Sequence, residues 1–329
     1  MKSMNVLILG LGACGLLPIP AVAQGAWKPQ QPIEIVVPAS AGGALDQPAR
    51  VLQQIWTEAH MMEVPVNVVN RAGGGQSVGL NYIHQGKGNP HRFAVMSGPL
   101  LTNYLTGKSA LQYSDFTVLA QLFNEYQAIA VPVESPLKNA NDLVARFKGA
   151  PDALSFAVGT TVGNATHMSL AIPLKRIGID IRRMKNVAFS SAGQSITAVL
   201  GAHVDVGAAA LSVLAPHKKN GKLRILVVTS PERLGGEFAD VPTWRELGVD
   251  VVIAAGRHLI APAGLTPAQI AWWDAQLGRT VKMPEWQKML DAQLWVNEYV
   301  PSHLARQNLD RLNAELREVL TDVGLAKQR

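Results

Sequence analysis

Residues 32–46 read PIEIVVPASAGGALD and decide the fold. The β-branched run Ile33–Val37 predicts a strand, and the small residues after it predict a tight loop. Asp46 is a good N-cap for a helix with one apolar face. That face comprises Ala49, Leu52, Ile55 and Trp56. A strand, a loop of small residues and a helix form the repeating unit of α/β proteins with largely parallel sheets.

The same unit recurs three times along the chain. In the second unit the strand is expected at Val66–Val69, the loop at Arg71–Gly75 and the helix at Ser77–Ile83. In the third, the strand Leu154–Val158 and the loop Gly159–Gly163 precede a helix through His167 and Leu170. In the fourth, the strand Val187–Phe189 and the loop Ser190–Gln194 precede the helix Ser195–Leu200. Further strands are expected at Arg92–Met96, Phe116–Val133, Val204–Ala208 and Arg224–Thr229, and further helices at Asn141–Phe147 and Leu304–Leu320. Two units fall in each half of the chain. This organisation predicts two α/β domains that face each other across a cleft.

The first residues resemble a secretory signal. Lys2 precedes the apolar run Met4–Leu17, and Ala21-Val22-Ala23 supplies the small residues that a signal peptidase recognises. We therefore expect residues 1–23 to be a signal peptide and the mature protein to start near Gln24 in the periplasm. As an alternative, Leu11-Gly12-Ala13-Cys14 fits a lipidation box, which would anchor the protein to lipid through its only cysteine.

The leader also contains a false dinucleotide motif. Gly10-Leu11-Gly12-Ala13-Cys14-Gly15 matches G-x-G-x-x-G, but the helix that should follow would be interrupted by Pro18 and Pro20. The signal peptide explains the same residues better. We expect no nucleotide cofactor, and no other cofactor either.

The composition narrows the function classes further. A chain of 329 residues with 48% hydrophobic content is long enough for two domains. Lys and Arg number 30 against 24 Asp and Glu, so loss of Lys2 with the leader leaves 29 minus 24, a net charge of +5. This mild excess favours anionic ligands. The densest basic stretch, Lys175–Lys185, is interrupted by isoleucines and by Asp180, so we expect no nucleic-acid partner.

The loop Ser40–Gly43 is the strongest local candidate for a binding site. Successive backbone N–H groups in a glycine turn, followed by a helix N-terminus, can bind an anion such as a carboxylate without a cationic side chain. The alternative is that the glycines only permit a turn and Asp46 only caps the helix. If the loop binds an anion, Asp46 is better assigned to orienting the loop than to contacting the anion, because its own charge repels an anion.

The three other loops offer the same chemistry together with hydroxyl groups. These hydroxyls belong to Ser77, Thr160, Thr161, Thr166, Ser191 and Ser195. Each hydroxyl could instead make a local turn or cap bond. His167 could donate to a carboxylate or be structural, and Arg257 could line the cleft or form a salt bridge.

Enzyme signatures are scarce. We find no G-x-S-x-G elbow and no phosphate-binding G-x-x-x-x-G-K-[ST] loop. The eight histidines are scattered without metal-ligand spacing, so we expect no metal site and no catalytic residue. A secreted hydrolase or isomerase is a further functional alternative, but we can name no nucleophile and base for it.

Several stretches resemble the receptors of tripartite tricarboxylate transporters, the Bug family. They are the leader, Pro32–Pro38, Ala41–Asp46, Asn70–Gly75, Gly201–Asp205, Gly221–Arg224, Val241–Gly248 and Ala261–Thr266. Together they cover essentially all of the chain from Pro32, in order. Asp115-Phe116, Gln121–Tyr126 and Trp286–Trp295 look closest to the tricarboxylate-receptor branch.

The resemblance implies a periplasmic-binding-protein-like venus flytrap, with two α/β domains around a ligand cleft, joined by crossing strands. Domain I would comprise residues 24–124 and 258–329, and domain II residues 125–257. The ligand-binding residues would be Ser40, Ala41, Gly42, Gly43, Asp46, Ser77, Ser97, Thr160, Thr161, Asn164, Thr166, His167, Ser191, Gly193, Gln194 and Arg257.

The same resemblance implies partners. A monomeric receptor would capture a small di- or tricarboxylate and present its closed form to a two-subunit membrane permease. A periplasmic sensor that presents the closed form to a signalling partner is the alternative.

Two departures from the family concern the ligand. Related receptors often have an acidic residue where this chain has Thr166, and many have a tryptophan near Gly256 with a glycine near His258. A missing tryptophan would enlarge the pocket. The resulting hypothesis is that the ligand is a bulkier acid, such as an aromatic dicarboxylate.

Overall fold

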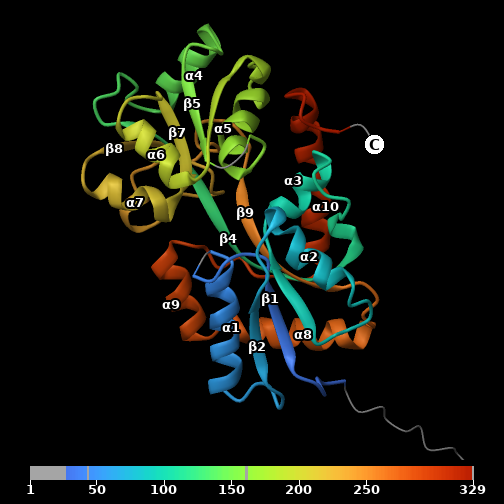
Figure 1. Ribbon diagram of the computed structural model, residues 1–329. Helices are drawn as coiled ribbons and strands as arrows, with labels where there is room; N and C mark the ends of the chain where they lie inside the picture. Colours follow the sequence, from blue (N-terminus) through green and yellow to red (C-terminus); the bar gives the residue numbers. More distant parts are fainter. Residues whose placement is uncertain (1–26, 43, 160–161, 328–329) are drawn as a thin grey trace, which may run out of the picture.

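The computed structural model describes residues 27–42, 44–159 and 162–327. The expected signal peptide, Cys14, Gly43, Thr160 and Thr161 therefore lie outside the described residues. The described chain forms two lobes, each built on a β-sheet with helices on its faces (Figure 1).

The sheet of lobe I is mixed. Its strands, in spatial order, are β2 (Val66–Asn70), β1 (Ile33–Val37), β3 (Arg92–Met96), β9 (Ala254–Pro262), β4 (Phe116–Pro132) and β10 (Val300–Pro301). Strand β1 pairs in parallel with β2 and β3, whereas β9 is antiparallel to β3 and β4. The three parallel strands are those that the sequence predicts for the first half.

The sheet of lobe II shares strand β4. Its order is β8 (Leu223–Val228), β4, β7 (Val206–Ala210), β5 (Ser155–Gly159) and β6 (Lys185–Phe189). Strand β5 pairs in parallel with β6 and β7, and β4 is antiparallel to β7 and β8.

Strand β4 connects the lobes as one continuous strand of 17 residues. Its first part, Phe116–Tyr126, pairs with β9 in lobe I, and its second part begins at Gln127, opposite Ala210 of β7 in lobe II. Thr229 fastens the returning chain at this point, because its buried Oγ1 accepts from the Gln127 N–H at 3.0 Å and donates to the Ile253 carbonyl at 2.6 Å.

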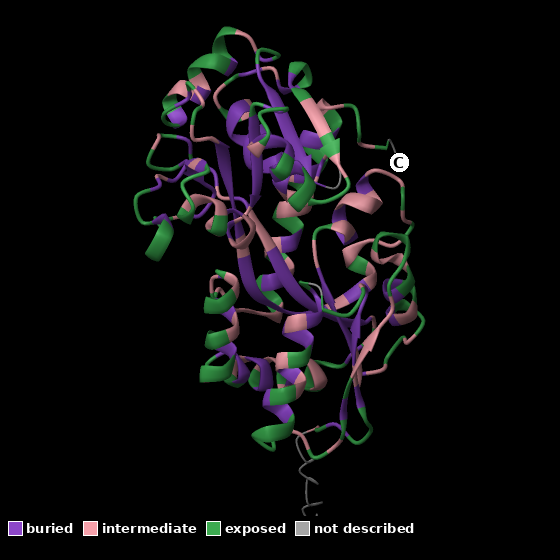
Figure 2. Ribbon diagram, turned by 60° about the vertical axis from the view of Figure 1, so that its left-hand side comes forward, coloured by how far each residue is buried: buried purple, intermediate pink, exposed green. Residues whose placement is uncertain are grey.

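Helices cover both faces of each sheet. In lobe I they are α1 (Asp46–Glu58), α2 (Ser77–His84), α3 (Pro99–Leu105), α8 (Pro267–Thr280), α9 (Pro284–Gln293) and α10 (Ser302–Asp322), and in lobe II α4 (Ala140–Gly149), α5 (Ala165–Arg176), α6 (Ala192–Leu200) and α7 (Leu211–Lys219). Figure 2 shows the central strands as buried ribbons and the outer helix faces as exposed, whereas the edge strands β2 and β6 are mostly intermediate or exposed. None of the helices within the described ranges is long and apolar enough to cross a membrane.

Three buried hydrophobic clusters stabilise this arrangement. One lies under α1, α8 and α9, where the rings of Phe93 and Trp273 are 4.8 Å apart at 76°. A second lies inside lobe II. The third runs without a break from Met96 in lobe I to Phe156 in lobe II, and it includes Leu320 of α10. The two lobes therefore share part of their core.

Four helices of the described chain were not expected from the sequence, namely α3, α7, α8 and α9. Helix α7 begins at Leu211, directly after β7, and the strand itself lies two residues later than the predicted Val204–Ala208. Pro216 lies inside α7, and Ala210 at its N-cap makes no side-chain cap bond. Both features remove the usual signals of a helix start and helix interior.

Candidate functional site

The strand directions turn six loops toward one place. In lobe I the carboxyl ends of β1, β2 and β3 lie beside the start of β9, because Met96 pairs with His258. In lobe II the carboxyl ends of β5, β6 and β7 lie beside the start of the second part of β4, because Ala210 pairs with Gln127. Both sets of loops therefore point toward the crossing at Tyr126 and Gln127.

Each lobe also has a topological switch point. The strand orders β2-β1-β3 and β6-β5-β7 place the first strand of each lobe in the middle, so the chain leaves it in one direction and later returns on its other side. Open α/β sheets bind ligands at such points, beyond the carboxyl ends of the strands. The loops after β1 and β3 and after β5 and β7 are therefore the candidate site.

The loop after β1 is held by Asp46. This buried carboxylate, 1% exposed, accepts from the Gly42 N–H at 2.8 Å, from Arg50 Nε at 2.7 Å and from Asn70 Nδ2 at 2.8 Å. Burial alone would raise the pKa of Asp46, but these hydrogen bonds outweigh burial and hold the pKa below its usual value. Asp46 is thus an anion whose acceptors are used within the protein, while Ser40, Ala41 and Gly42 are exposed.

The other loops of lobe I are tied to this one. Asn70, the last residue of β2, also donates to the Ala39 carbonyl at 3.1 Å, and Gln76 donates to Ser97 Oγ at 2.9 Å. Ser77 is the first residue of α2. The structure therefore brings the candidates Ser40–Gly42, Asp46, Ser77 and Ser97 to one edge of lobe I.

The loop before α5 is organised by Asn164. Its Oδ1 caps the helix by accepting from the His167 N–H at 2.9 Å, and its Nδ2 donates to the Gly159 carbonyl. Thr166 lies in the first turn and is 7% exposed. Asn164 thus closes the loop that connects the end of β5 to α5.

His167 is fully buried behind this loop. Its Nδ1 accepts from the Gly163 N–H at 3.3 Å, so the neutral ring carries its proton on Nε2, which is buried and has no hydrogen-bond partner among the residues that the structure describes. Burial lowers the pKa of His167 to about 4. At neutral pH His167 is therefore an uncharged donor.

The loop after β6 leads into helix α6. Ser191 Oγ accepts from the Gln194 N–H at 3.2 Å and caps the helix, and Ser191, Gly193 and Gln194 are exposed. This loop lies close to the end of β5, because a β-carbon on Gly159 would be 2.8 Å from the Cα of Ala192. The two candidate loops of lobe II are therefore packed backbone to backbone.

The N-terminus of α7 also belongs to this edge, and the sequence interpretation missed it. Helices α5 and α6 have side-chain caps, whereas α1 and α7 have none. Uncapped N–H groups at a helix start favour an anion. The small residues Gly207–Ala210 that lead into α7 were the available signal.

Arg257 lies apart from the loops, on the crossing strands. Its Nη2 donates to Glu125 Oε2 at 2.7 Å and its Nη1 to the Ala255 carbonyl at 3.0 Å, while Trp295 Nε1 donates to Glu125 Oε1 at 3.1 Å. The side chains of Arg257 and Glu125 are 8% and 13% exposed. The positive charge is thus matched by a buried carboxylate, although Nε has no partner.

The neighbouring His258 is also buried. Burial lowers the pKa of His258 to about 4, against a backbone contact with Gly256 that favours the charged ring. The ring lies against Gly256, where a β-carbon would be 2.7 Å from the histidine Cε1.

The electrostatics of this region favour an anion held by dipoles. Loop N–H groups, helix starts and hydroxyls face the crossing, while the charges of Asp46 and Arg257 are engaged by partners in the fold. Within residues 27–42, 44–159 and 162–327, no group of three or more His, Cys, Asp or Glu side chains is placed to hold a metal ion.

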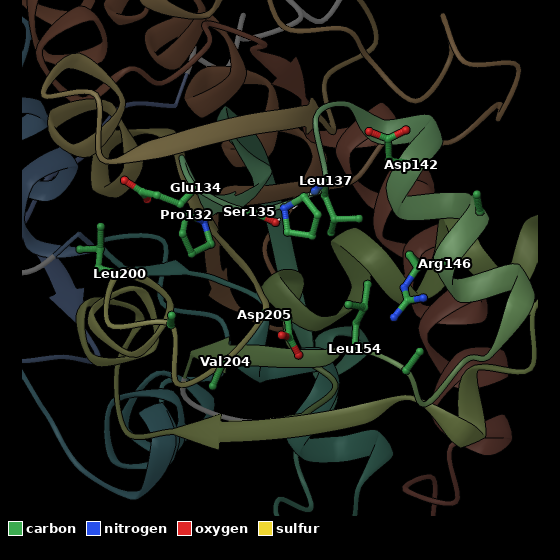
Figure 3. Close-up of a pocket in the computed structure, with 14 residues that line it drawn as sticks. Pro132, Glu134, Ser135, Leu137, Asp142, Arg146, Leu154, Leu200, Val204 and Asp205 are labelled. Atoms are coloured by element: carbon green, nitrogen blue, oxygen red, sulfur yellow. Dashed lines mark hydrogen bonds between the residues drawn. The ribbon is translucent and has the colours of Figure 1, made fainter.

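A surface hollow of about 1010 Å³ lies at the opposite end of lobe II (Figure 3). It is lined by residues at the end of β4 and before β5 and β7, among them Pro132, Leu154 and Asp205. Leu137 and Leu154 in its lining are buried core residues, and Asp205 already accepts from the N–H and Oγ of Ser155 at 2.7 and 2.6 Å. This hollow is therefore not part of the candidate site.

A family model described as the tripartite tricarboxylate transporter family receptor matches residues 49–318. Among curated relatives, a UPF0065 protein from the gbd 5' region of Cupriavidus necator is 26% identical over 318 residues, which cover 96% of this chain and 94% of the relative.

Solved structures share the fold. A TctC solute-binding protein from Polaromonas, without ligand, has a TM-score of 0.79 at 23% identity and covers 89% of this chain and 99% of its own. R. palustris Rpa4515 with adipate has a TM-score of 0.71 at 19% identity, covering 91% and 99%. MatC from Rhodopseudomonas palustris with bound malate has a TM-score of 0.63 at 21% identity, covering 91% and 100%. The expected α/β fold of periplasmic binding proteins is confirmed.

Proposed function

The chain belongs to the tripartite tricarboxylate transporter receptor family, whose members are solute-binding proteins and not enzymes, and we propose that it captures a small organic carboxylate for uptake. The mature protein would start near Gln24 and act as a monomer in the periplasm. It would present its ligand-bound form to a two-subunit membrane permease. Lipid attachment through Cys14 is the alternative mode of localisation.

One observation carries the proposal. The switch points of two sheets face one crossing, and the loop of the first is fastened from behind by Asp46. A carboxylate at Ser40–Gly43 would accept from loop N–H groups other than that of Gly42, which already donates to Asp46. Hydrogen bonds to an ionised acceptor are about twice as strong as neutral ones.

A second carboxylate of the same ligand would be held by lobe II. The donors proposed there are the loop at Thr160, Thr161 and Asn164, the His167 Nε2–H, and the hydroxyl and amide groups at Ser191, Gly193 and Gln194. Thr166, Ser77 and Ser97 would line the same space. Because the donors come from both lobes, a ligand with two or more carboxylates bridges them and favours the closed form.

We propose the same domain boundaries for the mature protein as the family resemblance implies. Domain I would comprise residues 24–124 and 258–329, and domain II residues 125–257. The change of pairing partner at Tyr126 and Gln127 supports a hinge there.

The ligand class is a di- or tricarboxylate. Adipate in Rpa4515 and malate in MatC support this class for proteins of the same fold. An aromatic dicarboxylate remains a candidate because Gly256 replaces a larger side chain, but the ring of His258 takes up room beside that glycine. We therefore include both aliphatic and aromatic diacids in the test.

A thermal-shift screen of residues 24–329 tests the proposal. The panel contains adipate, malate, citrate and terephthalate, each with its diamide or triamide as a matched neutral control. A true ligand at 100 times its Kd adds about 2.7 kcal/mol to the free energy of unfolding, and its amide adds nothing. If calorimetry also detects no binding of any acid in the panel, the proposal for these ligands fails.

A further inference from the structure

The C-terminal helix of lobe I reaches lobe II. Its first turn is fastened to lobe I, where Ser302 donates from N and Oγ to Asp274 at 2.9 and 2.7 Å. Tyr113 donates to Asp310 Oδ1 at 2.6 Å further along the helix. The far end of α10 lies beside α5 of lobe II (Figure 1).

Ion pairs join the two helices at this end. Lys175, near the end of α5, lies 2.8 Å from Glu318 Oε1 and also pairs with Asp322. Arg176 lies 3.8 Å from Glu315. The side chain of Lys175 is only 29% exposed, and it is the cation that two carboxylates of α10 share.

An apolar contact joins α10 to the loop before α5. Leu320 is fully buried, and a β-carbon on Gly163 would be 2.7 Å from its Cδ2. Gly163 has φ +98°, so both its backbone and its surroundings require glycine. The turn after α10 is held on lobe I, because the Lys327 N–H donates to the Leu105 carbonyl at 2.9 Å.

These contacts meet at a proposed ligand loop. Gly163 precedes Asn164, which caps α5. The Gly163 N–H donates to His167 Nδ1. A shift of α10 relative to α5 would therefore move the donors of lobe II relative to those of lobe I.

We propose that Lys175 and Leu320 are positioning residues, which hold the lobe II loop at a fixed place relative to lobe I before ligand binds. The effect on ligand affinity rests on the proposed function, because a ligand that bridges the lobes requires their donors to be the right distance apart. If only a fraction of the molecules has the two lobes at the distance that binding requires, the apparent Kd rises in inverse proportion to that fraction.

Charge reversal with rescue tests the proposal. The variants are Lys175→Glu, which turns the ion pairs into repulsion, and the triple variant Lys175→Glu, Glu318→Lys, Asp322→Lys, which restores them with opposite signs. Arg183→Glu is the control, because it changes the charge of lobe II equally while Arg183 pairs with Asp152 in its own lobe. Lys175 is partly buried but belongs to none of the three hydrophobic clusters, so its substitution leaves the cores intact.

The main measurement needs no ligand. Spin labels on Gln54→Cys in α1 and Lys219→Cys in α7, both exposed positions, report the distance between lobes by pulsed dipolar EPR. We expect one narrow distribution for the parent and Arg183→Glu, a broader or shifted one for Lys175→Glu, and recovery in the triple variant. An unchanged distribution in Lys175→Glu, or no recovery in the triple variant, overturns the proposal.

The second measurement is the Kd of the diacid identified in the thermal-shift panel. Lys175→Glu should weaken it about threefold to fivefold, and the triple variant should restore it. An unchanged or tighter Kd in Lys175→Glu overturns the positioning role. If no acid binds the parent, the proposed function fails while the EPR result still decides whether the contact fixes the lobes.

Discussion

The Asp46 carboxylate accepts the Gly42 N–H at 2.8 Å, so the first residue of α1 fixes the backbone of the loop that precedes it. The same side chain accepts from Asn70 at the end of β2. The buried charge of Asp46 therefore links the first strand unit to the second, and it shapes the exposed loop between β1 and α1.

Replacement of Asp46 by Asn should destabilise the protein. A carboxylate only accepts hydrogen bonds, whereas the amide of Asn would place its own N–H₂ against one of three donors. We expect a loss of about 1–3 kcal/mol in the free energy of unfolding, measured by urea denaturation, and a loss of carboxylate affinity. Arg50→Gln, which removes an exposed partner, should cost less than about 1 kcal/mol. Wild-type stability of Asp46→Asn would mean that the loop does not depend on this charge.

Stability should fall between pH 6.5 and pH 4. The pKa of both His167 and His258 is lowered to about 4 by burial, whereas unfolded histidine titrates near pH 6.5. Between these values the unfolded state binds more protons, so each histidine removes on the order of 1 kcal/mol per pH unit as the pH falls. Urea denaturation at pH 7, 6 and 5 measures this slope.

The control for this effect is a pair of variants. His167→Gln and His258→Gln should each flatten the slope above pH 5, because glutamine does not titrate. Asp46, whose pKa is below its usual value, loses its contribution only at about pH 4 and lower, outside this window. Equal stability at pH 7 and pH 5 in the parent would contradict the buried neutral state of the two histidines.

The sequence predicted those parts of the fold that local patterns encode. The run Ile33–Val37 and the apolar face after Asp46 each report on their own neighbourhood, so β1 and α1 lie where they were expected, but the expected N-cap Asp46 is instead the first residue of α1 and Leu45 is its N-cap. The same holds for the helix through His167, whose cap at Asn164 precedes it directly. The four strand–loop–helix units, two in each half of the chain, predicted two facing domains, and the family resemblance added the crossing strands that join them.

Other features depend on partners far away in the chain. Arg257 could not be assigned from sequence because its partner Glu125 lies on another strand, 132 residues earlier. The contact between Lys175 and α10 is equally remote. The start of α7 was missed because Ala210 carries no cap signal. Pairings of this kind are decided by strand order and helix packing, which single residues do not report.

The role of Arg257 can be decided by stability. Arg257→Met leaves Glu125 as a buried charge without its main partner, so we expect a loss of about 3–5 kcal/mol in the free energy of unfolding. The double variant Arg257→Met, Glu125→Gln removes both charges and should lose less than Arg257→Met alone. Urea denaturation of the two variants gives the comparison. If Arg257→Met keeps its stability but loses carboxylate binding, Arg257 is a ligand residue and not a partner of the hinge.

The close approach of the two lobe II loops predicts that Gly159 cannot be enlarged. A β-carbon there would be 2.8 Å from the Cα and 3.0 Å from the N of Ala192, both backbone atoms that cannot turn aside. Gly159→Ala must therefore push the start of α6 away from the end of β5, and we expect a loss of about 1–3 kcal/mol together with weaker carboxylate binding. Gly149→Ala is the matched control, because nothing lies within 4 Å of a β-carbon at this last position of α4. Urea denaturation and calorimetry of both variants separate the two cases. A Gly159→Ala protein that binds its ligand like the parent would show that the spacing of these loops does not matter for binding.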